Sequence, residues 1–470
     1  MNAPTSDLHQ TLLLMRNAHM QDPTPAWSVR SGWLDRLERM LLEQRDAFAE
    51  AISADFGTRP REETDLLEIF PSLSGLRHAR RRGRHWMRPR KGMADMAFLP
   101  AGTTMLPQPR GVVGVIVPWN YPLYLAVGPL IDALVAGNRV MVKMSEFTPG
   151  FSSLFAHKVA EYFKPDEVCV VTGDADVAQA FSALPFDHLL FTGSTAVGHH
   201  VMRAASAHLT PVTLELGGKS PAIIGPGARF EHAVERILYG KLVNAGQTCI
   251  APDYVLLPRQ RVGDFVTAAH RVTGRLYPQI AQRGQFASIV ADRHFQRLTT
   301  LRDDAVIAGA RAERLGDSDQ DPNRRFLPPT LLLHVNDNMA VMREEIFGPL
   351  LPLVPYDSID QAIDYVAGRP HPLALYLFDD DRKTIDRVLA RTQAGGVTVN
   401  DTLYHIAQHG LPFGGVGKSG MGGYHGEAGF RTFSHMKPVF RQARFNGVRL
   451  LNPPYGQRFR NMVRLLFKLG

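Results

Sequence analysis

The stretch GVVGVIVPWNYPLYLAVGPLIDALVAGNRVMVKM, residues 111–144, holds the pattern that decides the fold. The run VVGVIVP near its start is apolar and rich in β-branched residues, which predicts a buried strand. The spacing of apolar residues then predicts a helix over about 123–136, with Gly137 placed to end it. A second β-rich run, RVMVKM, follows at 139–144. A strand, a helix and a strand in this order are typical of a parallel sheet.

The same unit recurs further along the chain. β-rich runs at 167–173, 187–193 and 211–218 alternate with helical patterns at 174–184 and 194–208. Apolar strands that alternate with helices of this length predict a parallel sheet covered on both faces. The predicted fold class is therefore α/β, with a doubly wound, Rossmann-like parallel sheet whose ligands bind beyond the carboxyl ends of the strands.

The rest of the chain predicts further domains around this sheet. Residues 1–100 are mainly helical in pattern, including a helix with its N-cap at Ser31 and its end at Gly57. A second α/β region runs from about 219 to 400. We expect N-terminal helices and the Rossmann-like domain in 1–216, with a strand-like segment at about 98–110, and a second α/β domain in 217–402. Residues 403–470 are then expected to return to the first domain and to end in a basic tail.

The composition describes a soluble globular protein. Hydrophobic residues make up 44% and charged residues 21% of 470 residues, which is enough apolar material for more than one core. Two cysteines cannot form a disulfide framework and the N-terminus lacks a signal-peptide pattern, so we predict a cytoplasmic location. The uncharged stretch 111–131 is long enough to cross a bilayer, but Pro118, Pro122 and Pro129 would interrupt such a helix, and we reject a transmembrane span.

The formal net charge of +8 comes from two basic segments, residues 77–91 and 437–470. Solvated surfaces, an oligomer contact, nucleic acid or an anionic membrane would each suit such segments. We do not expect a nucleic-acid partner, because no recognisable nucleic-acid-binding module accompanies the charge. The tail at 458–470 places apolar residues at helical spacing between Arg and Lys, which leaves packing on the protein body and peripheral membrane contact as alternatives.

Three residues are candidates for catalysis. Cys249 ends the stretch NAGQTC, residues 244–249, and has no His, Lys or carboxylate within four residues, so it is either an inert cysteine or a nucleophile with distant partners. Glu215 lies in an otherwise apolar strand, where burial would raise its pKa toward that of a general base. Asn120 follows the first strand and could donate to a developing oxyanion or cap its own turn. No metal-ligand spacing is present, so we expect no dedicated metal site.

Two further stretches are candidates for binding a dinucleotide. FTGSTAVG, residues 191–198, joins a strand to a helix through Gly193 and Ser194, so N–H groups at the helix start could face a pyrophosphate, or the stretch could be a plain turn. Lys143 and Glu146 follow the second strand, where an acidic residue can accept hydrogen bonds from ribose hydroxyls. A surface ion pair is the alternative for these two residues.

Seven stretches together closely resemble the aldehyde dehydrogenase superfamily. In chain order they are PWNYP, KMSE, FTGSTAVG, LELGGKSP, NAGQTC, EEIFGPLLP and LPFGGVGKSGMG, and they span about residues 100–440. NAGQTCIAPDYVLLP and the segment GMGGYHGEAGFRTFSHMKP resemble the class 3 branch. PFDHLLFTGSTAVG and PVTLELGGKSP are most similar to the coniferyl-aldehyde dehydrogenases within that branch.

The resemblance implies an oxidation of an aldehyde to a carboxylic acid through a thiohemiacetal and a thioester on Cys249. The oxyanion would be held by the Asn120 amide and the Cys249 backbone N–H, and Glu215 would activate the hydrolytic water. The cofactor implied is NAD, because Glu146 should repel a 2′-phosphate, while Lys143 leaves NADP open. Glu345 and Phe347 would position the nicotinamide ribose, Lys143 and Glu146 the adenosine ribose, and Gly193 and Ser194 would lie along the dinucleotide. Met144 departs from the family, which usually has Pro after this Lys.

The resemblance also implies a small β element for oligomerisation and a homodimer. The aldehyde would be aromatic, of the cinnamaldehyde type such as coniferyl aldehyde, or medium-chain aliphatic. Two other functions stay open from the residues alone. A cofactor-independent cysteine hydrolase or acyltransferase would pair Cys249 with a histidine base. A non-enzymatic protein would bind a polyanion or a membrane through the basic segments, in a way that survives Cys249→Ala.

Overall fold

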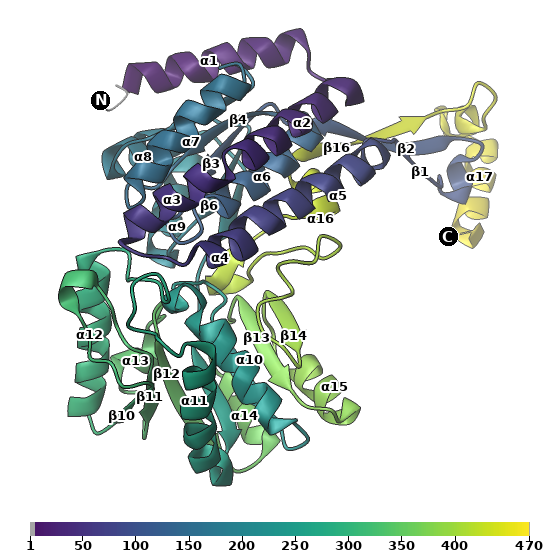
Figure 1. Cartoon of the computed structure of the whole chain (residues 1–470). Helices are drawn as coiled ribbons and strands as arrows, with labels where there is room; N and C mark the ends of the chain where they lie inside the picture. The colour runs from purple at the N-terminus through teal and green to yellow at the C-terminus, as the bar shows by residue number, and fades with distance from the viewer. Residues whose placement is uncertain (1–4, 470) are drawn as a thin grey trace.

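The computed structural model describes residues 5–469, which form three sheets and the helices around them (Figure 1). The strands are β1 (Arg90–Gly92), β2 (Gly102–Pro109), β3 (Val112–Ile116), β4 (Arg139–Lys143), β5 (Val168–Val171), β6 (His188–Thr192), β7 (Val212–Glu215), β8 (Pro221–Ile224), β9 (Tyr254–Pro258), β10 (Arg311–Arg314), β11 (Thr330–Leu333), β12 (Leu350–Tyr356), β13 (Ala374–Phe378), β14 (Gly396–Val399), β15 (Gly420–Met421) and β16 (Ser434–Arg441). The α-helices are α1 (Thr5–Gln21), α2 (Trp27–Glu43), α3 (Arg45–Phe56), α4 (Arg61–Thr64), α5 (Phe70–Trp86), α6 (Tyr124–Ala136), α7 (Pro149–Tyr162), α8 (Ala175–Ser182), α9 (Thr195–Ser206), α10 (Phe230–Leu242), α11 (Val262–Leu276), α12 (Asp292–Ile307), α13 (Ala340–Arg343), α14 (Ile359–Ala367), α15 (Arg382–Arg391), α16 (Gly426–Thr432) and α17 (Gln457–Leu469).

The first sheet has the strand order β15-β7-β6-β3-β4-β5, and all its pairs are parallel except that of β15 with β7. Alternate residues of a strand point to opposite faces, and here they enter two different cores. Val113 and Val115 belong to the core under α6 and α7, whereas Val112 and Ile116 belong to the core under α1, α8 and α9. The apolar run is buried on both faces for this reason, and the predicted doubly wound α/β fold is confirmed.

The second sheet has the order β10-β11-β12-β9-β8-β13-β14, parallel except for the edge strand β10. It is built from residues between 221 and 399, and α10 and α14 pack on it. In Figure 1 this sheet occupies the lower half of the molecule and the first sheet the upper half. The predicted second α/β region is therefore present.

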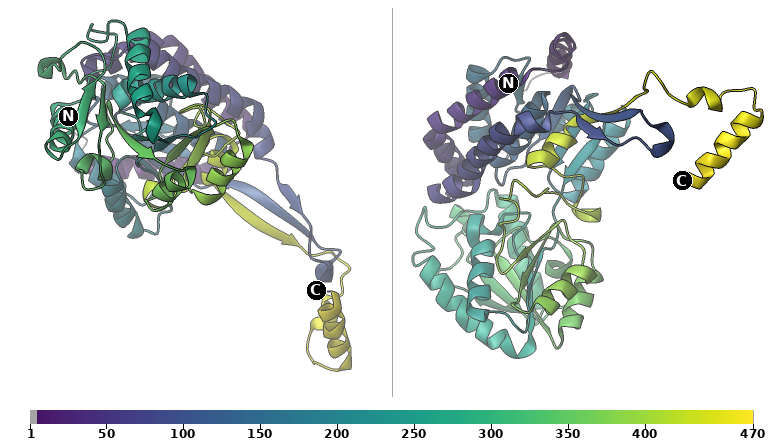
Figure 2. Two further views of the ribbon diagram at one scale, coloured as in Figure 1. Left: turned by 90° about the horizontal axis from the view of Figure 1, so that it is seen from below. Right: turned by 90° about the vertical axis from the view of Figure 1, so that its right-hand side faces the viewer.

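The third sheet is an antiparallel arm with the order β1-β2-β16. Residues Gly102–Pro109 of β2 pair along their length with Ser434–Arg441 of β16, so the strand-like segment expected at about 98–110 joins the C-terminal region. The arm extends away from the body and carries α17 at its far end (Figure 2). Helix α17 lies near the 3₁₀ turn Met96–Phe98 at the tip of the arm, so the C-terminal segment packs on the arm rather than on the two large sheets.

Some local expectations were wrong. Ser31 is not an N-cap, because α2 begins four residues earlier at Trp27 and the Ser31 hydroxyl donates to the Ser28 carbonyl oxygen inside the helix. The pattern from Ser31 to Gly57 is also two helices, because α2 ends at Glu43 and α3 begins at Arg45. Gly57 does end α3, in a left-handed conformation with φ 85° that suits glycine.

The apolar stretch 111–131 contains β3 and the first part of α6, which lies between the sheet and the N-terminal helices. Across residues 5–469, the structure has no helix that combines the length and the apolar character needed to cross a membrane.

Candidate active site

The carboxyl ends of three neighbouring parallel strands bring the first catalytic candidates together. Asn120 follows β3, Gly193 follows β6, and Glu215 is the last residue of β7. Strand pairing places Thr192 opposite Glu215, so the ends of β6 and β7 coincide. The second α/β region contributes Cys249, Glu345 and Phe347 from the opposite side. All six residues line one cavity of about 580 Å³ between the two regions.

The turn that carries Cys249 has an unusual backbone. Helix α10 ends at Leu242, and Asn244 and Ala245 then adopt left-handed conformations with φ 52° and 51°. Such conformations are costly for residues other than glycine and persist where the surroundings fix them. The Gln247 amide donates to the carbonyl oxygens of Asn244 and Ser288, at 3.0 Å each. The Asn-Ala-Gly-Gln-Thr sequence therefore builds a rigid turn just before the thiol.

The surroundings of Cys249 favour the neutral thiol. Burial, together with the nearby carboxylates of Glu345 and Glu215, raises the pKa of the Cys249 thiol to about 12. The backbone N–H groups of Cys249 and Ile250 face the sulfur and act in the opposite direction, but they do not outweigh the burial. The chain alone therefore holds this cysteine protonated near neutral pH, and the same N–H groups are suited to an oxyanion.

Asn120 is hydrogen-bonded to the turn that carries Cys249 through both its side chain and its backbone. Its side-chain amide nitrogen donates to the Gln247 carbonyl oxygen at 3.1 Å, and its own carbonyl oxygen accepts from the Asn244 amide at 3.0 Å. A primary amide carries two N–H donors, so one hydrogen of Asn120 is available to a ligand. Asn120 is 3% exposed and lines the cavity together with Cys249.

Glu215 is a buried carboxyl group without a protein partner. It is 2% exposed, and in the described part of the chain neither of its carboxylate oxygens has a hydrogen-bond partner. Burial raises the pKa of Glu215 well above its usual value. An unpaired buried carboxyl is costly for stability, so its place on the wall of the cavity indicates a chemical use.

Glu345 and Phe347 lie on the opposite wall. Burial raises the pKa of Glu345 to about 8, and its Oε1 atom has no hydrogen-bond partner within residues 5–469. Gly217 faces this carboxyl group so closely that a Cβ atom there would lie 1.9 Å from Oε2 of Glu345. The Phe347 ring packs edge-on against Trp119, with ring centroids 5.4 Å apart.

Gly193 and Ser194 form the start of α9 at the other end of the same cavity. The Ser194 hydroxyl oxygen accepts from the Val197 N–H at 3.3 Å and is the N-cap of α9. The Gly193 N–H donates to the Glu215 carbonyl oxygen at 3.0 Å, and a Cβ at Gly193 would meet the Phe191 ring. The N-terminal end of α9 is therefore exposed to the cavity, where its N–H groups and helix dipole suit an anion.

Lys143 and Glu146 do not line this cavity. Lys143 is buried, and its ammonium donates to the carbonyl oxygens of Met144 at 2.7 Å and Gly173 at 2.8 Å. Glu146 is exposed three residues beyond β4. Both residues are on the carboxyl edge of the first sheet, next to the strand that precedes Asn120, and both lie apart from the catalytic candidates.

A second, apolar cavity of about 140 Å³ also reaches Cys249. Its lining includes Leu66, Phe70, Tyr121, Tyr239, Leu403 and Tyr404. Three residues, Leu125, Cys249 and Ile406, line both cavities, so the thiol lies at their junction. Apart from Cys249, the sequence did not single out the residues of this cavity, because they come from segments that lie far apart in the chain.

The first cavity also contains residues that the sequence analysis missed. His294, Arg297 and Trp119 line it, and the His294 ring lies against Trp119 with centroids 5.2 Å apart. Trp119 belongs to the quoted PWNYP stretch, but His294 and Arg297 are on α12 and carried no local signal. In the described residues no histidine is hydrogen-bonded to Cys249, so the pairing expected of a cysteine hydrolase is not seen there.

These features define a class of protein: a two-domain α/β enzyme with a buried cysteine, an unpaired carboxyl group and a cleft at the strand ends. Comparison with known proteins gives the family. The model for the aldehyde dehydrogenase family matches residues 6–439. A relative from Pseudomonas aeruginosa named "Probable coniferyl aldehyde dehydrogenase" is 51% identical over 452 residues, which is 96% of this chain and 94% of the relative. The coniferyl aldehyde dehydrogenase of Pseudomonas sp. strain HR199 is 47% identical over 460 residues, again 96% and 94%.

Solved structures agree with this assignment. The substrate-bound state of Staphylococcus aureus AldH superimposes with a TM-score of 0.92 at 36% identity, covering 99% of this chain and 100% of that one. A Mycobacterium tuberculosis aldehyde dehydrogenase complexed with NAD+ gives a TM-score of 0.84 at 28% identity, covering 94% and 91%. The chain belongs to the aldehyde dehydrogenase family, and its activity is the NAD(P)-dependent oxidation of aldehydes.

The residues of the first cavity suit a nicotinamide dinucleotide. The unpartnered Oε1 of Glu345 is an acceptor for a ribose hydroxyl, and the start of α9 is suited to a pyrophosphate. Gly217 and Gly193 also line the cavity, and a Cβ atom at either position would clash with Glu345 or Phe191, so both positions require glycine. The cleft therefore fits the cofactor that the family uses.

Proposed function

We propose that Cys249 is the nucleophile of this dehydrogenase and that the enzyme oxidises an apolar, aromatic aldehyde of the cinnamaldehyde type. The observation that supports this proposal is the place of Cys249 at the junction of two cavities of different character. One cavity has glycines, a helix start and buried carboxyl groups, and it suits the cofactor. The other is apolar and suits the body of the aldehyde.

In the first step, the Cys249 sulfur adds to the aldehyde carbon and the carbonyl oxygen takes up the negative charge. The thiol proton passes to water in the cavity. The free N–H of the Asn120 amide and the Cys249 backbone N–H hold the oxyanion. The bonds from Asn120 to the nucleophile turn keep these donors at a fixed separation, so little reorganisation accompanies the reaction.

NAD(P), when bound, supplies a hydride acceptor, so the carbon on Cys249 is left at the oxidation level of a thioester. Glu345 and Phe347 would hold the nicotinamide ribose, and Gly193 and Ser194 would border the pyrophosphate. Lys143 and Glu146 would meet the adenosine ribose at the carboxyl edge of β4. We propose NAD as the preferred form, because the Glu146 carboxylate would repel a 2′-phosphate.

In the last step, Glu215 accepts a proton from the water that attacks the thioester. The carbon–sulfur bond then breaks, the carboxylic acid leaves, and Cys249 is restored. A buried carboxyl group with no protein partner is suited to this role, because its raised pKa makes it a stronger base than an exposed glutamate.

The substrate class is supported by the lining of the second cavity and by the relatives. Its walls are almost entirely apolar apart from tyrosine hydroxyls, and the relatives with 47–51% identity are named for coniferyl aldehyde. An aromatic aldehyde with a phenolic end would use both features, by packing its ring and hydrogen-bonding its hydroxyl. A medium-chain aliphatic aldehyde would use the apolar walls alone.

The test is a panel of substrates, in which each reaction is monitored by the absorbance of the reduced cofactor. Coniferyl aldehyde, cinnamaldehyde, octanal and acetaldehyde are compared with NAD and with NADP, in the native protein and in Cys249→Ala. We expect the highest kcat/KM for the aromatic aldehydes with NAD, and no activity in Cys249→Ala. Equal kcat/KM for acetaldehyde and coniferyl aldehyde would contradict the substrate class, and an active Cys249→Ala would contradict the mechanism.

We further propose that the chain is a cytoplasmic homodimer that uses the arm as its contact. Large apolar side chains are exposed there, including Phe440 at 53% and Phe445 at 83%, and exposed apolar surface of this kind marks contact sites. Peripheral membrane contact by the basic tail is the competing use of the same surface. In the other basic segment, residues 77–91, Arg77 forms an ion pair with Glu38 and Arg80 with Asp35 on α2. These arginines are therefore less available to a polyanion, which argues against a polyanion-binding protein.

A further inference from the structure

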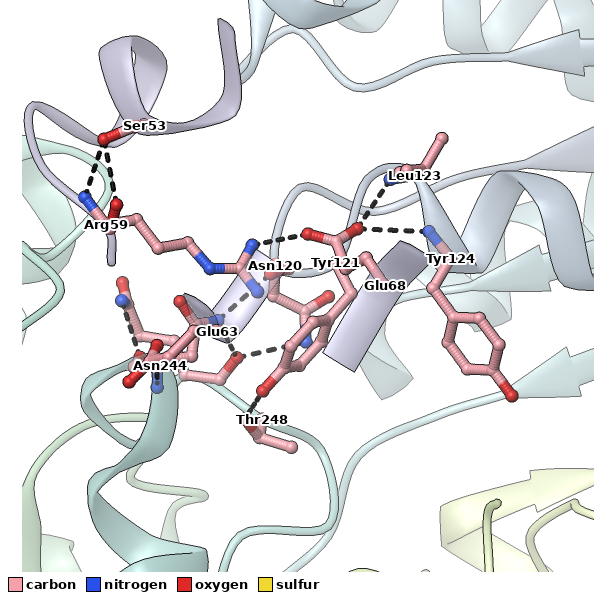
Figure 3. A network of polar contacts seen from close by, with 11 residues as sticks. Ser53, Arg59, Glu63, Glu68, Asn120, Tyr121, Leu123, Tyr124, Asn244 and Thr248 are labelled. Atoms are coloured by element: carbon pink, nitrogen blue, oxygen red, sulfur yellow. Dashed lines mark hydrogen bonds and ion pairs between the residues drawn. The ribbon is translucent and has the colours of Figure 1, made fainter. Parts of the chain in front are cut away.

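We propose that Arg59 and Glu68 are positioning residues, which hold the loop with Asn120 against the turn with Cys249. This inference rests on the proposed roles of Asn120 and Cys249. Neither Arg59 nor Glu68 lines either cavity at Cys249, so both act through other residues. Figure 3 shows the network, in which these residues lie between the N-terminal helices and the two loops.

Glu68 lies on a single π-helical turn, Asp65–Ile69, between α4 and α5. Such turns are rare and often occur at functional sites. The Glu68 side chain is fully buried, and its Oε2 atom accepts from the backbone N–H groups of Leu123 at 2.8 Å and Tyr124 at 3.1 Å. Helix α6 has no side-chain cap of its own, so this carboxylate supplies the acceptor that the helix start needs. The loop that contains Asn120 ends at this point.

Arg59 connects Glu68 to the same loop from the other side. Its Nη1 atom lies 2.5 Å from Oε1 of Glu68, and both side chains are inaccessible to solvent. The guanidinium also lies over the Tyr121 ring, 5.0 Å from the centroid. Ser53 fixes the Arg59 backbone by hydrogen bonds to both its N–H and its carbonyl oxygen. Residues 120–124 are therefore held between a cation at Tyr121 and an anion at the start of α6.

Two contacts carry this restraint to the nucleophile turn. The Tyr121 hydroxyl lies 2.6 Å from the hydroxyl of Thr248, the residue before Cys249. On the other side of the turn, Oε2 of Glu63 accepts from the backbone N–H of Asn244 at 2.9 Å, where the backbone is left-handed. The Arg59 charge also lowers the pKa of Glu63, against a larger upward shift from burial. The segment 59–68 thus contacts both catalytic loops.

Stability alone does not account for the Arg59–Glu68 pair. A buried ion pair is often no more stabilising than apolar residues of the same size. In the described part of the chain the Nε and Nη2 atoms of Arg59 have no hydrogen-bond partner, so the pair leaves buried donors unsatisfied. What the pair does provide is a fixed direction for Tyr121 and for the start of α6.

The experiment is a double-mutant cycle on the full-length protein. Arg59→Met, Asn120→Ala and the double variant are compared by kcat and KM for aldehyde oxidation and by hydrolysis of 4-nitrophenyl acetate. The ester reaction forms the same kind of oxyanion at Cys249 without a cofactor. We expect Arg59→Met to lower kcat by about 100-fold with KM changed by less than about threefold, because a small misplacement of a catalytic group has effects of this size. In the Asn120→Ala background we expect Arg59→Met to lower the rate of both reactions by less than about threefold, because the two residues act together.

Arg36→Met is the matched control. Arg36 is hydrogen-bonded to Glu167 at 2.9 Å in an ion pair on the outer side of the first domain, and neither residue lines the two cavities. We expect it to lower the melting temperature and leave kcat unchanged. Glu68→Gln serves if Arg59→Met does not fold, because glutamine keeps an acceptor for the α6 N–H groups while removing the charge. Arg59→Lys, which keeps the charge without the planar fork, should recover part of kcat.

Two outcomes would overturn the inference. One is that Arg59→Met lowers kcat by the same factor in the native protein and in the Asn120→Ala background. The other is that Arg59→Met lowers the melting temperature and leaves kcat unchanged. The proposed function fails in a different way: Asn120→Ala would then leave both reactions at full rate. The two failures are therefore distinguishable in one set of variants.

Discussion

The hydroxyl groups of Tyr121 and Thr248 lie 2.6 Å apart, so the loop after β3 touches the residue before Cys249. This contact joins the two domains directly beside the thiol. We expect Tyr121→Phe to lower kcat by about fivefold, because the net value of one such hydrogen bond is about 1 kcal/mol. Thr248→Val should have the same effect, and the double variant should be no worse than either single one. Steady-state kinetics check this, and additive losses would show that the contact is not shared.

The Cys249 thiol should titrate far above its usual range in the protein without cofactor. Its pKa is raised to about 12 by burial and by the carboxylates of Glu345 and Glu215. Alkylation requires the thiolate, so the rate of reaction with iodoacetamide should keep rising from pH 7 to pH 10 without a plateau. Glu215→Gln should speed the reaction at pH 9, because it removes one of the carboxylates. Cys249→Ser measures the background from Cys169, and a plateau below pH 8 would contradict the expectation.

Loss of the Glu215 carboxyl should stop the reaction at the thioester. We expect Glu215→Gln to form reduced cofactor in a burst equal to the enzyme concentration, followed by turnover slower by about 10²–10⁴-fold. The mass of the protein after the burst should include the acyl group. The native rate should rise with pH, because the base is active without its proton and its pKa is raised. Slow turnover with no burst would assign Glu215 to an earlier step.

The free energy of unfolding should fall as pH rises, because Asp132 is buried with a raised pKa. This α6 residue is 3% exposed and accepts from the His425 N–H at 2.9 Å, and burial raises its pKa to about 8. In the unfolded chain its pKa is about 3.9. Between these values the unfolded chain has released the proton and the folded chain has kept it, so stability is full below about pH 4 and falls until about pH 8.

Asp132→Asn should remove this dependence. We expect the variant to gain about 5 kcal/mol over the native protein in unfolding free energy between pH 4 and pH 8, at about 1.4 kcal/mol for each pH unit. Urea unfolding at the two pH values measures the difference. Asp357→Asn is the control at an exposed carboxylate, and it should show no such gain because the Arg259 guanidinium lowers the pKa of Asp357. If the unfolding free energies of Asp132→Asn and the native protein differed by the same amount at both pH values, the raised pKa of Asp132 would be contradicted.

The arm should control the oligomeric state. We expect Phe440→Asp to convert a dimer into a monomer in light scattering, because a charge would enter the proposed contact at β16. Leu209→Asp is the matched control, since Leu209 is 89% exposed in the turn before β7. Dissociation by both variants, or by neither, would contradict the assignment of the contact to the arm.

Much of the fold could be predicted because its signals are local. The run VVGVI is apolar at every position, and only a strand covered on both faces uses such a pattern. Helix α6 begins and ends within one residue of the predicted range, since Gly137 takes the left-handed conformation expected of a helix end. The error at Ser31 has a local cause as well: a serine inside a helix can donate to a carbonyl oxygen of the preceding turn, as Ser31 does to Ser28.

The candidate site was predicted less completely. Cys249, Glu215 and Asn120 could be named because each lies in a short stretch that resembles the family. Arg59 and Glu68 could not, because their use depends on contacts with residues 55 or more positions away, such as Glu68 with Leu123. The apolar cavity was missed for the same reason: Phe70, Tyr239 and Leu403 become neighbours only in the folded chain.

The sequence by itself determined which segments become strands and helices, since alternation, helical spacing and glycine placement act within a few residues. It also determined which reactive groups are present, namely the thiol of Cys249, the carboxyl group of Glu215 and the amide of Asn120. Only the tertiary structure decided that these three share one cavity and that the pKa values of Cys249 and Glu215 are raised. Burial and distance between groups are properties of packing, and packing joins β3, β7 and the turn after α10 across more than a hundred residues.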